Sequence, residues 1–283
     1  MVFLVNKSKL MGVFNMQVIG LCRFSYPAIG GFQVGHDSIE ERIDYLWSRD
    51  RLEERFRLLE TMALPCMRAQ TDPDFDLVIL IGDQFPQVHR ERLHDLTADM
   101  RQVRIVAEPP KNSRDICKQL LNGARRDPSQ PCLQFRHDDD DACAVDFIEK
   151  LRAAAADCHA LTQRHKTVAF DWNRGHVAEV SAKGIAATAI YRPFYVSSLG
   201  MYVQGNCNLT IHNFMHEKLP RFMPSVSFSE PDMFVRTHNG YNDSRQKKVK
   251  DWPVEPLNAQ QVDLFRDRFA VDINAVRDVF SRA

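Results

Sequence analysis

The chain has 283 residues, enough for one large or two small domains with a substantial buried core. Lysine and arginine together number 37, as do aspartate and glutamate, so the formal net charge is zero. A neutral chain gives no reason to expect a nucleic-acid partner, and any charge that matters for function must be concentrated locally. The 7 cysteines form no CxxC pair, which argues against a disulfide framework or a structural zinc site and indicates reduced thiols in a cytoplasm.

The N-terminal segment 1–15 mixes apolar residues with polar ones such as Asn6 and Lys7. It is too short and too interrupted for a signal peptide or a membrane span. We therefore expect an extension with no role in the fold. No later segment of the sequence is long and apolar enough to span a membrane.

Strands and helices are expected to alternate in the first half of the chain, because short apolar runs are separated by stretches with helical spacing. In chain order the expected elements are a strand at 16–22, a helix within 38–63, a strand at 75–81, a helix at 86–100, a strand at 103–106, a helix at 111–126, a strand at 131–137 and a helix at 145–155. This alternation is typical of an α/β fold with a mostly parallel sheet and helices on both faces.

The pattern changes after about residue 161. Strand-like pieces follow at 167–172, 176–180 and 185–191, and the tail 257–283 is expected to form two short helices. A boundary near residue 162 marks a change of role within one domain more than the start of a second domain.

Four successive aspartates, Asp138 to Asp141, directly follow the predicted strand at 131–137. Burying an unpaired carboxylate is prohibitively costly, so something must neutralise this charge. Ligands of open parallel sheets bind at the carboxyl ends of the strands, where this turn would lie. Alternate residues of an extended segment point the same way, so Asp138 and Asp140 can both reach one divalent cation. The alternative is a solvated acidic turn that caps the next helix.

Two stretches of sequence resemble known families. Residues 136–151 (RHDDDDACAVDFIEKL) resemble the strand, DxD motif and amphipathic helix of GT-A glycosyltransferases. A wider string is similar to the bacterial putative rhamnosyltransferase family, and its parts are RFS at 23–25, YL at 45–46, RLEERF at 51–56, LP at 64–65, QTDPDF at 70–75 and FRHDDDD at 135–141. The resemblance covers roughly residues 16–245.

The resemblance implies a GT-A fold with a short C-terminal helical extension. It implies a nucleotide-sugar-binding half at 16–162, and an acceptor-binding half with the C-terminal helices at 163–283. The implied function is a metal-dependent glycosyltransferase of polysaccharide biosynthesis. It would move a sugar such as rhamnose, with inversion, from a nucleotide-diphosphate donor to a glycan or lipid-linked acceptor. Deoxyhexose transfer is implied by analogy with the family.

By the same resemblance, the aspartates hold the donor and a Mn²⁺ or Mg²⁺ cofactor. Asp138 would lie near the ribose and share the metal, Asp139 would lie beside the nucleotide, and Asp140 would be the principal metal ligand. Asp141 would open the following helix. Asp83, at the end of the second strand, would lie near the base.

Arg23 ends the first strand and is a candidate for binding the base or the diphosphate, with an ordinary surface arginine as the alternative. The segment from Glu230 to Arg236 resembles the acidic pair and arginine of inverting enzymes. Either Glu230 or Asp232 could be the general base for the acceptor hydroxyl. The spacing to Arg236 favours Glu230, and the usual second position of the pair favours Asp232.

GT-A sites often complete the metal shell with a late histidine. His238 is the best candidate because it follows the acidic pair, and His212 and His216 are the others. For each of the three, an ordinary hydrogen-bonded histidine is the more common situation.

The basic run Arg245, Lys247, Lys248 and Lys250 could cover a diphosphate or touch an anionic membrane surface, although such runs are more often solvated loops. Membrane contact is therefore expected to be peripheral at most, at the inner face. Trp172 could stack on a sugar or belong to the core.

Two other functions compete with sugar transfer. A sugar nucleotidyltransferase shares the sheet and the metal, but the expected glycine-rich, lysine-bearing loop is lacking, since Phe32 and Gln33 follow Gly30-Gly31. A non-catalytic protein that binds a divalent cation or a nucleotide is the other alternative. No spaced calcium loop with a distal glutamate supports it.

Overall fold

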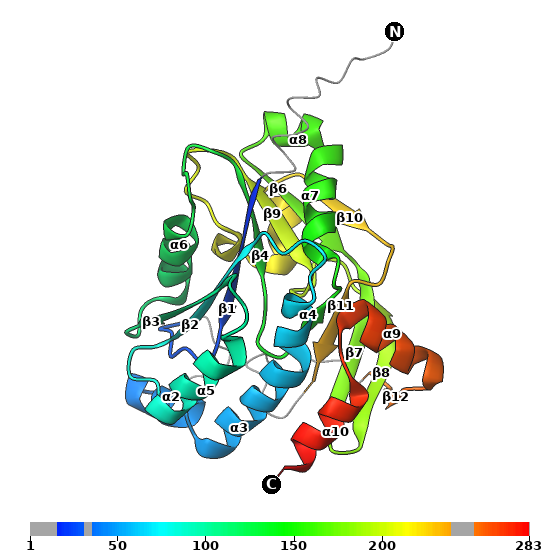
Figure 1. Cartoon of the computed structure of the whole chain (residues 1–283). Coiled ribbons are helices and arrows are strands. Elements are labelled where there is room, and N and C mark those ends of the chain that lie inside the picture. The colour runs from blue at the N-terminus through cyan, green and yellow to red at the C-terminus, as the bar shows by residue number, and fades with distance from the viewer. Residues whose placement is uncertain (1–15, 31–35, 239–251, 283) are drawn as a thin grey trace.

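The computed structural model describes residues 16–30, 36–238 and 252–282. The predicted extension at 1–15 lies outside them. The described chain forms a seven-stranded central sheet and a second, five-stranded sheet (Figure 1). None of the helices within these ranges is long and apolar enough to cross a membrane.

Four parallel strands form one side of the central sheet. They lie in the order β4 (Cys132–Arg136), β1 (Gln17–Arg23), β2 (Asp76–Gly82) and β3 (Val103–Glu108). The inner strands are apolar at nearly every position because helices cover both faces. All four strands were expected from the sequence, to within about two residues at each end.

Three strands of the second half complete the central sheet. β9 (Leu199–Val203) lies antiparallel between β4 and β6 (Thr167–Trp172), and β10 (Ser225–Phe228) pairs in parallel with β6. Strand β9 had not been predicted. The two halves of the chain thus share one sheet, and the division of roles near residue 162 stays a prediction.

The second sheet extends from the aspartate segment. Its order is β12 (Glu255–Pro256), β8 (Gly184–Tyr191), β7 (Arg174–Ser181), β11 (Phe234–Thr237) and β5 (Ala142–Cys143). β5 begins directly after the four aspartates and pairs antiparallel with β11. This pairing brings the last residues of β11, Arg236 and Thr237, to the aspartates.

The helices fall into two groups on opposite faces of the central sheet. One face is covered by α6 (Ser113–Gly123). The other is covered by the remaining long helices of the first half, namely α3 (Arg49–Leu58), the π-helical turn η1 (Leu59–Ala63), α4 (Leu64–Arg68), α5 (Gln87–Thr97) and α7 (Phe147–Asp157). The other helical elements are α2 (Ile39–Leu46), α8 (His159–Arg164), η2 (Ile211–Asn213), η3 (His216–Arg221), α9 (Ala259–Phe269) and α10 (Ile273–Ser281). Figure 1 shows α9 and α10 beside the β7–β8 hairpin.

Close packing under α7 fixes the central strands. At Gly200 of β9 a β-carbon would collide with the Leu151 side chain, and at Gly20 of β1 it would collide with the Phe135 ring. Trp172 lies in this core, 3% exposed, with its ring stacked on Phe228 at 5.1 Å. Of the two interpretations of Trp172, the structure therefore favours the core residue. The predicted mixed α/β fold with a parallel-rich sheet is confirmed.

Candidate active site

The aspartates lie at the carboxyl end of β4, next to the carboxyl end of β1. β4 ends at Arg136, one residue before the expected end, and His137 is buried just beyond it. Parallel strands place their carboxyl ends at the same edge, so Arg23 at the end of β1 is a neighbour of this turn. This edge is where an open α/β sheet binds its ligand.

Three of the four aspartates converge. One carboxylate oxygen from each of Asp138, Asp140 and Asp141 lies within 4.8 Å of the other two. Such oxygens are the ligands that hard divalent cations such as Mg²⁺ and Mn²⁺ prefer. The donor set is therefore compatible with the expected cation. Asp139 does not join this group.

Arg55, on α3, pairs with the two middle aspartates. Its Nε donates to Asp139 Oδ2 at 3.0 Å, and its Nη2 donates to Oδ1 of the same carboxylate. Its Nη1 donates to Asp140 Oδ2 at 2.9 Å. Arg55 was part of the string that carried the family resemblance, but its contact with the aspartates was not foreseen.

Asp141 is bound from the second half of the chain. It accepts hydrogen bonds from the Ser197 hydroxyl at 2.6 Å and from the Thr237 backbone N–H at 3.1 Å. Arg236 Nη1 lies 3.6 Å from Asp141 Oδ2 and 3.9 Å from Asp138 Oδ2. The Arg236 guanidinium also lies over the Tyr195 ring, 4.7 Å from its centre. The acidic turn is thus held by Arg55 on one side and Arg236 on the other.

Burial and charge shift the pKa values of this group. Burial raises the pKa of Asp141 to about 7, with further repulsion from Asp140 and Asp138, although Arg236 and Ser197 favour the ionised form. Burial alone would lower the pKa of Arg236. The surrounding carboxylates, Asp141 foremost, hold it above the usual value. Arg236 therefore stays charged.

One expectation for the aspartates was wrong, and the alternative of a solvated turn is not supported either. Asp141 does not open the following helix, because β5 intervenes and α7 begins only at Phe147, after Asp146. Nor is the turn a solvated helix cap. Asp139, Asp140 and Asp141 are 5%, 8% and 1% exposed, because the two arginines provide the neutralising charge that burial requires.

The helical stretch that continues from α3 through η1 and α4 contacts the segments on either side of the turn. His137 Nε2 lies 3.0 Å from the carbonyl oxygen of Ala63 in the π-helical turn. Gln70, just beyond α4, donates to Ala144 O at 2.8 Å and accepts from Ile148 N–H at 3.0 Å. A π-turn within an α-helix often marks a functional site. Here it lies against the strand that delivers the aspartates.

The predicted nucleotide contacts lie at the same edge. Arg23 Nη1 donates to Ser113 Oγ at 3.2 Å, which places Arg23 at the N-terminus of α6. Asp83 lies exposed after β2, and its backbone N–H donates to Glu108 O at 3.1 Å. Arg23 is the last residue of β1 and Asp83 directly follows β2, as the sequence predicted. Their contacts with a nucleotide stay predictions.

None of the three candidate histidines belongs to the compact carboxylate group found among the described residues. His238 directly follows Thr237, the residue whose backbone binds Asp141, and the His238 backbone N–H donates to Ala178 O at 2.8 Å. Burial lowers its pKa, and Arg236 lowers it further. His216 Nδ1 lies 2.6 Å from Phe194 O. Burial lowers the pKa of His212 well below its usual value, and the charges of Arg136 and Arg23 lower it further. A histidine metal ligand stays a prediction.

Glu230 and Asp232 lie together at the start of β11. Arg174 contacts both carboxylates, at 3.4 Å for Glu230 and 3.2 Å for Asp232. The Glu230 side chain is 83% exposed and that of Asp232 18%. Asp141 lies at the other end of β11, where it binds Thr237, so the length of the strand, about 10 Å at 3.3 Å per residue, lies between the two groups. The structure brings the pair together without bringing it into contact with the aspartates.

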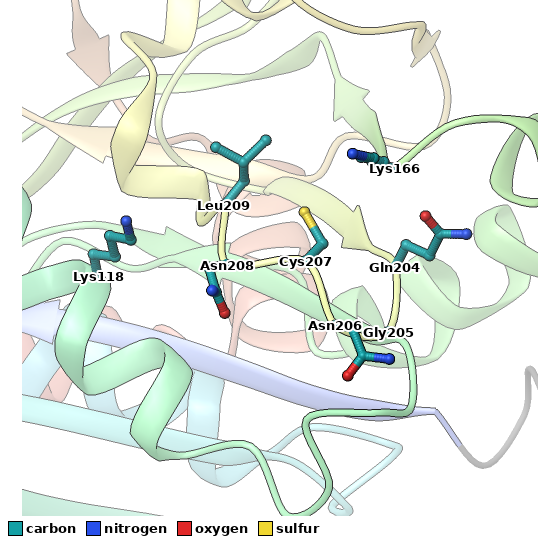
Figure 2. Close-up of a pocket in the computed structure, with 8 residues that line it drawn as sticks. All are labelled: Lys118, Lys166, Gln204, Gly205, Asn206, Cys207, Asn208 and Leu209. Atoms are coloured by element: carbon teal, nitrogen blue, oxygen red, sulfur yellow. The ribbon is translucent and has the colours of Figure 1, made fainter.

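A pocket at the opposite edge of the central sheet is remote from this site. Its volume is about 290 Å³, and Figure 2 shows Lys118 and Lys166 on either side of the loop that carries Cys207. Lys166 directly precedes β6 and Gln204 directly follows β9, which runs antiparallel to β6, so both lie at the edge of the sheet where β6 begins. The aspartates follow β4, which runs in the same direction as β6, so they lie at the edge where β6 ends. The predicted basic run at 245–250 lies outside the described residues.

Comparisons with known proteins agree with the expectation from the sequence. Residues 17–251 match the family described as "Putative rhamnosyl transferase". The chain belongs to this family. The match spans well over half of the chain and covers the aspartates, Arg55 and the whole of β11. It therefore confirms the predicted family, whose description is that of a glycosyltransferase.

Among solved structures, the chain is similar to residues 1–349 of TarS from S. aureus. For one TarS structure the TM-score is 0.39 with 10% identity, covering 78% of this chain and 60% of the other. For TarS in complex with UDP the TM-score is 0.41 with 11% identity, covering 79% and 61%. This chain thus spans about three fifths of the length of each TarS chain. No curated protein matches it in sequence.

Proposed function

We propose that this protein is a metal-dependent glycosyltransferase that uses a nucleotide-diphosphate sugar. The observation that carries the proposal is the group of three converging carboxylates, Asp138, Asp140 and Asp141, at the carboxyl end of β4 in a chain of a rhamnosyl transferase family. Asp140 and Asp138 would hold Mg²⁺ or Mn²⁺. When bound, that cation would offset the charge that develops on the departing diphosphate.

The donor would lie along the edge formed by β1, β2 and β4. Arg23 would contact the diphosphate or the base from the end of β1, and the N-terminus of α6 beside it favours negative charge. Asp83 would lie near the base, and Asp138 near the ribose. Asp139 would lie beside the nucleotide, with its charge paired to Arg55.

The acceptor would bind on the side of β11. An inverting transfer needs a base on the face of the sugar opposite the leaving group, so the base must lie away from the metal. Glu230 and Asp232 meet that requirement, because β11 separates them from the carboxylate group. Arg174 contacts both carboxylates, and either could accept the proton of the acceptor hydroxyl.

The family supports rhamnose, or another deoxyhexose, as the transferred sugar. The proposed acceptor is a glycan or a lipid-linked glycan of polysaccharide biosynthesis. A lipid-linked acceptor would be met at the inner face of the membrane by peripheral contact. UDP, the nucleotide bound to TarS in one solved structure, is one of three donor nucleotides to be tested.

Calorimetry with UDP, GDP and dTDP, each with and without Mn²⁺, tests the class and the donor nucleotide together. We expect one nucleotide to bind tightly and only with the metal. Asp140→Asn keeps the shape and removes the charge, and it should lower turnover by about three orders of magnitude, or roughly 4 kcal/mol. Asp95→Asn, at an exposed position of α5, is the matched control.

Normal transfer by Asp140→Asn, or by the unmodified protein in excess EDTA, would rule out the metal-dependent reaction. The released product separates the two enzyme classes. Sugar transfer releases a nucleoside diphosphate, whereas a nucleotidyltransferase releases pyrophosphate.

A further inference from the structure

Arg55 makes the most extensive charged contact with the acidic turn. Its guanidinium uses three nitrogen atoms, two on Asp139 and one on Asp140. The side chains of Arg55, Asp139 and Asp140 are only 6%, 7% and 11% exposed. The pairing is therefore shielded from water, and its geometry is set by the protein.

The planar guanidinium fork explains why this position suits arginine. Two parallel N–H groups match the two oxygens of one carboxylate, and the third nitrogen can reach a neighbouring acceptor. Lysine would bring a single point charge, which cannot grip Asp139 with two bonds and bridge to Asp140 at the same time.

This contact separates the four aspartates by role. Asp139 has both oxygens bound by Arg55 and lies outside the group of three. Asp140 has its Oδ2 bound by Arg55 and still offers an oxygen to the group. The orientation of Asp140 therefore depends on an arginine that is not part of the acidic segment.

The helix beneath Arg55 is fixed. Leu52, one turn before Arg55, and Phe56, the residue directly after it, are fully buried, and the Phe24 and Phe56 ring centroids lie 4.8 Å apart. Ala63 of the same helical stretch holds His137, just before the aspartates. A guanidinium mounted on this helix can hold the turn in a constant geometry.

We propose that Arg55 is a positioning residue that binds Asp139 and Asp140 so that Asp140 faces the metal site together with Asp138 and Asp141. The inference rests on the proposed metal-dependent function. It extends that function by assigning the orientation of the acidic turn to α3. Outer partners of metal ligands typically change metal affinity or activity by 10- to 100-fold when removed.

The test compares Arg55→Gln with Arg57→Gln. Arg57 lies on the same helix and contacts Glu54 and the carbonyl of Arg282, away from the aspartates. Mn²⁺ binding is measured by electron paramagnetic resonance, with Mn²⁺ alone and again with UDP present. We expect Mn²⁺ affinity to fall by about 10- to 100-fold in Arg55→Gln and to stay unchanged in Arg57→Gln.

Two further variants separate positioning from charge balance. Arg55→Gln with Asp139→Asn removes a positive and a negative charge together, and we expect its Mn²⁺ binding to stay weak because Asp140 is still unsupported. Arg55→Lys keeps the charge and provides a folded variant should Arg55→Gln not fold. It too should bind Mn²⁺ about tenfold more weakly, because the fork is lost.

The outcomes distinguish this inference from the proposed function. If the unmodified protein binds no Mn²⁺ in either condition, the metal site and the inference both fail. If it binds Mn²⁺ and Arg55→Gln or Arg55→Lys binds equally well or better, only the role of Arg55 is overturned. Recovery of normal Mn²⁺ binding in the double variant would likewise overturn it, since Arg55 would then serve only to balance charge.

Discussion

Ser197→Ala should destabilise the protein by removing one of the hydrogen bonds that join the acidic turn to the second half of the chain. The Ser197 hydroxyl lies 2.6 Å from Asp141 Oδ2, and the two residues are 4% and 1% exposed. A hydrogen bond to a charged group contributes about 1.5–3 kcal/mol. At about 2–4 °C per kcal/mol for a large domain, the melting temperature should fall by roughly 3–12 °C.

The adjacent residue provides a matched control. Ser198 is equally buried at 2% exposure, and its hydroxyl donates at the same distance of 2.6 Å to the carbonyl oxygen of Met233. This acceptor is neutral, so Ser198→Ala should cost only about 0.5–1.5 kcal/mol. The two variants differ mainly in the charge of the acceptor.

Urea unfolding near pH 8, where Asp141 is largely ionised, measures both costs. Adding Asp141→Asn completes a double-mutant cycle, and the cost of Ser197→Ala should then fall to the neutral range, for a coupling of about 1 kcal/mol. If Ser197→Ala costs no more than Ser198→Ala, or if Asp141→Asn leaves its cost unchanged, the charged hydrogen bond does not contribute as argued.

Two further predictions concern carboxylates outside the acidic turn. Burial raises the pKa of Asp171 to about 6 from 3.8, so the folded protein binds this proton more tightly than the unfolded chain. Asp171 should therefore contribute a fall of about 3 kcal/mol in stability as pH rises from about 4 to 6, and Asp171→Asn should make the decline smaller by about that amount in urea titrations. A decline of equal size in Asp171→Asn and in the unmodified protein would contradict this. Either Glu230→Gln or Asp232→Asn should lower turnover by about two to four orders of magnitude with donor binding intact. Near-normal turnover in both variants would exclude the pair as base.

Local sequence was enough to locate the strands of the central sheet that are apolar at almost every position. The runs of β1, β2 and β4 could be located because a parallel strand covered on both faces has little room for polar residues. The acidic segment was located by the same logic, since its charge begins where an apolar run ends. β9 was missed, although it is equally buried, because its five residues lie in an irregular stretch without a clear start or stop signal.

Tertiary structure alone decided how the acidic segment is neutralised. Arg55 precedes Asp139 by 84 residues, and Thr237 follows Asp141 by 96, so no local pattern relates them. The pairing of β5 with β11 brings Arg236 and Thr237 to the turn, and the packing of α3 brings Arg55. Sequence spacing specifies which residues lie side by side on one element. A buried carboxylate is stable only where a partner neutralises it, and for these aspartates the partners come from distant segments, so they were set by how the elements pack.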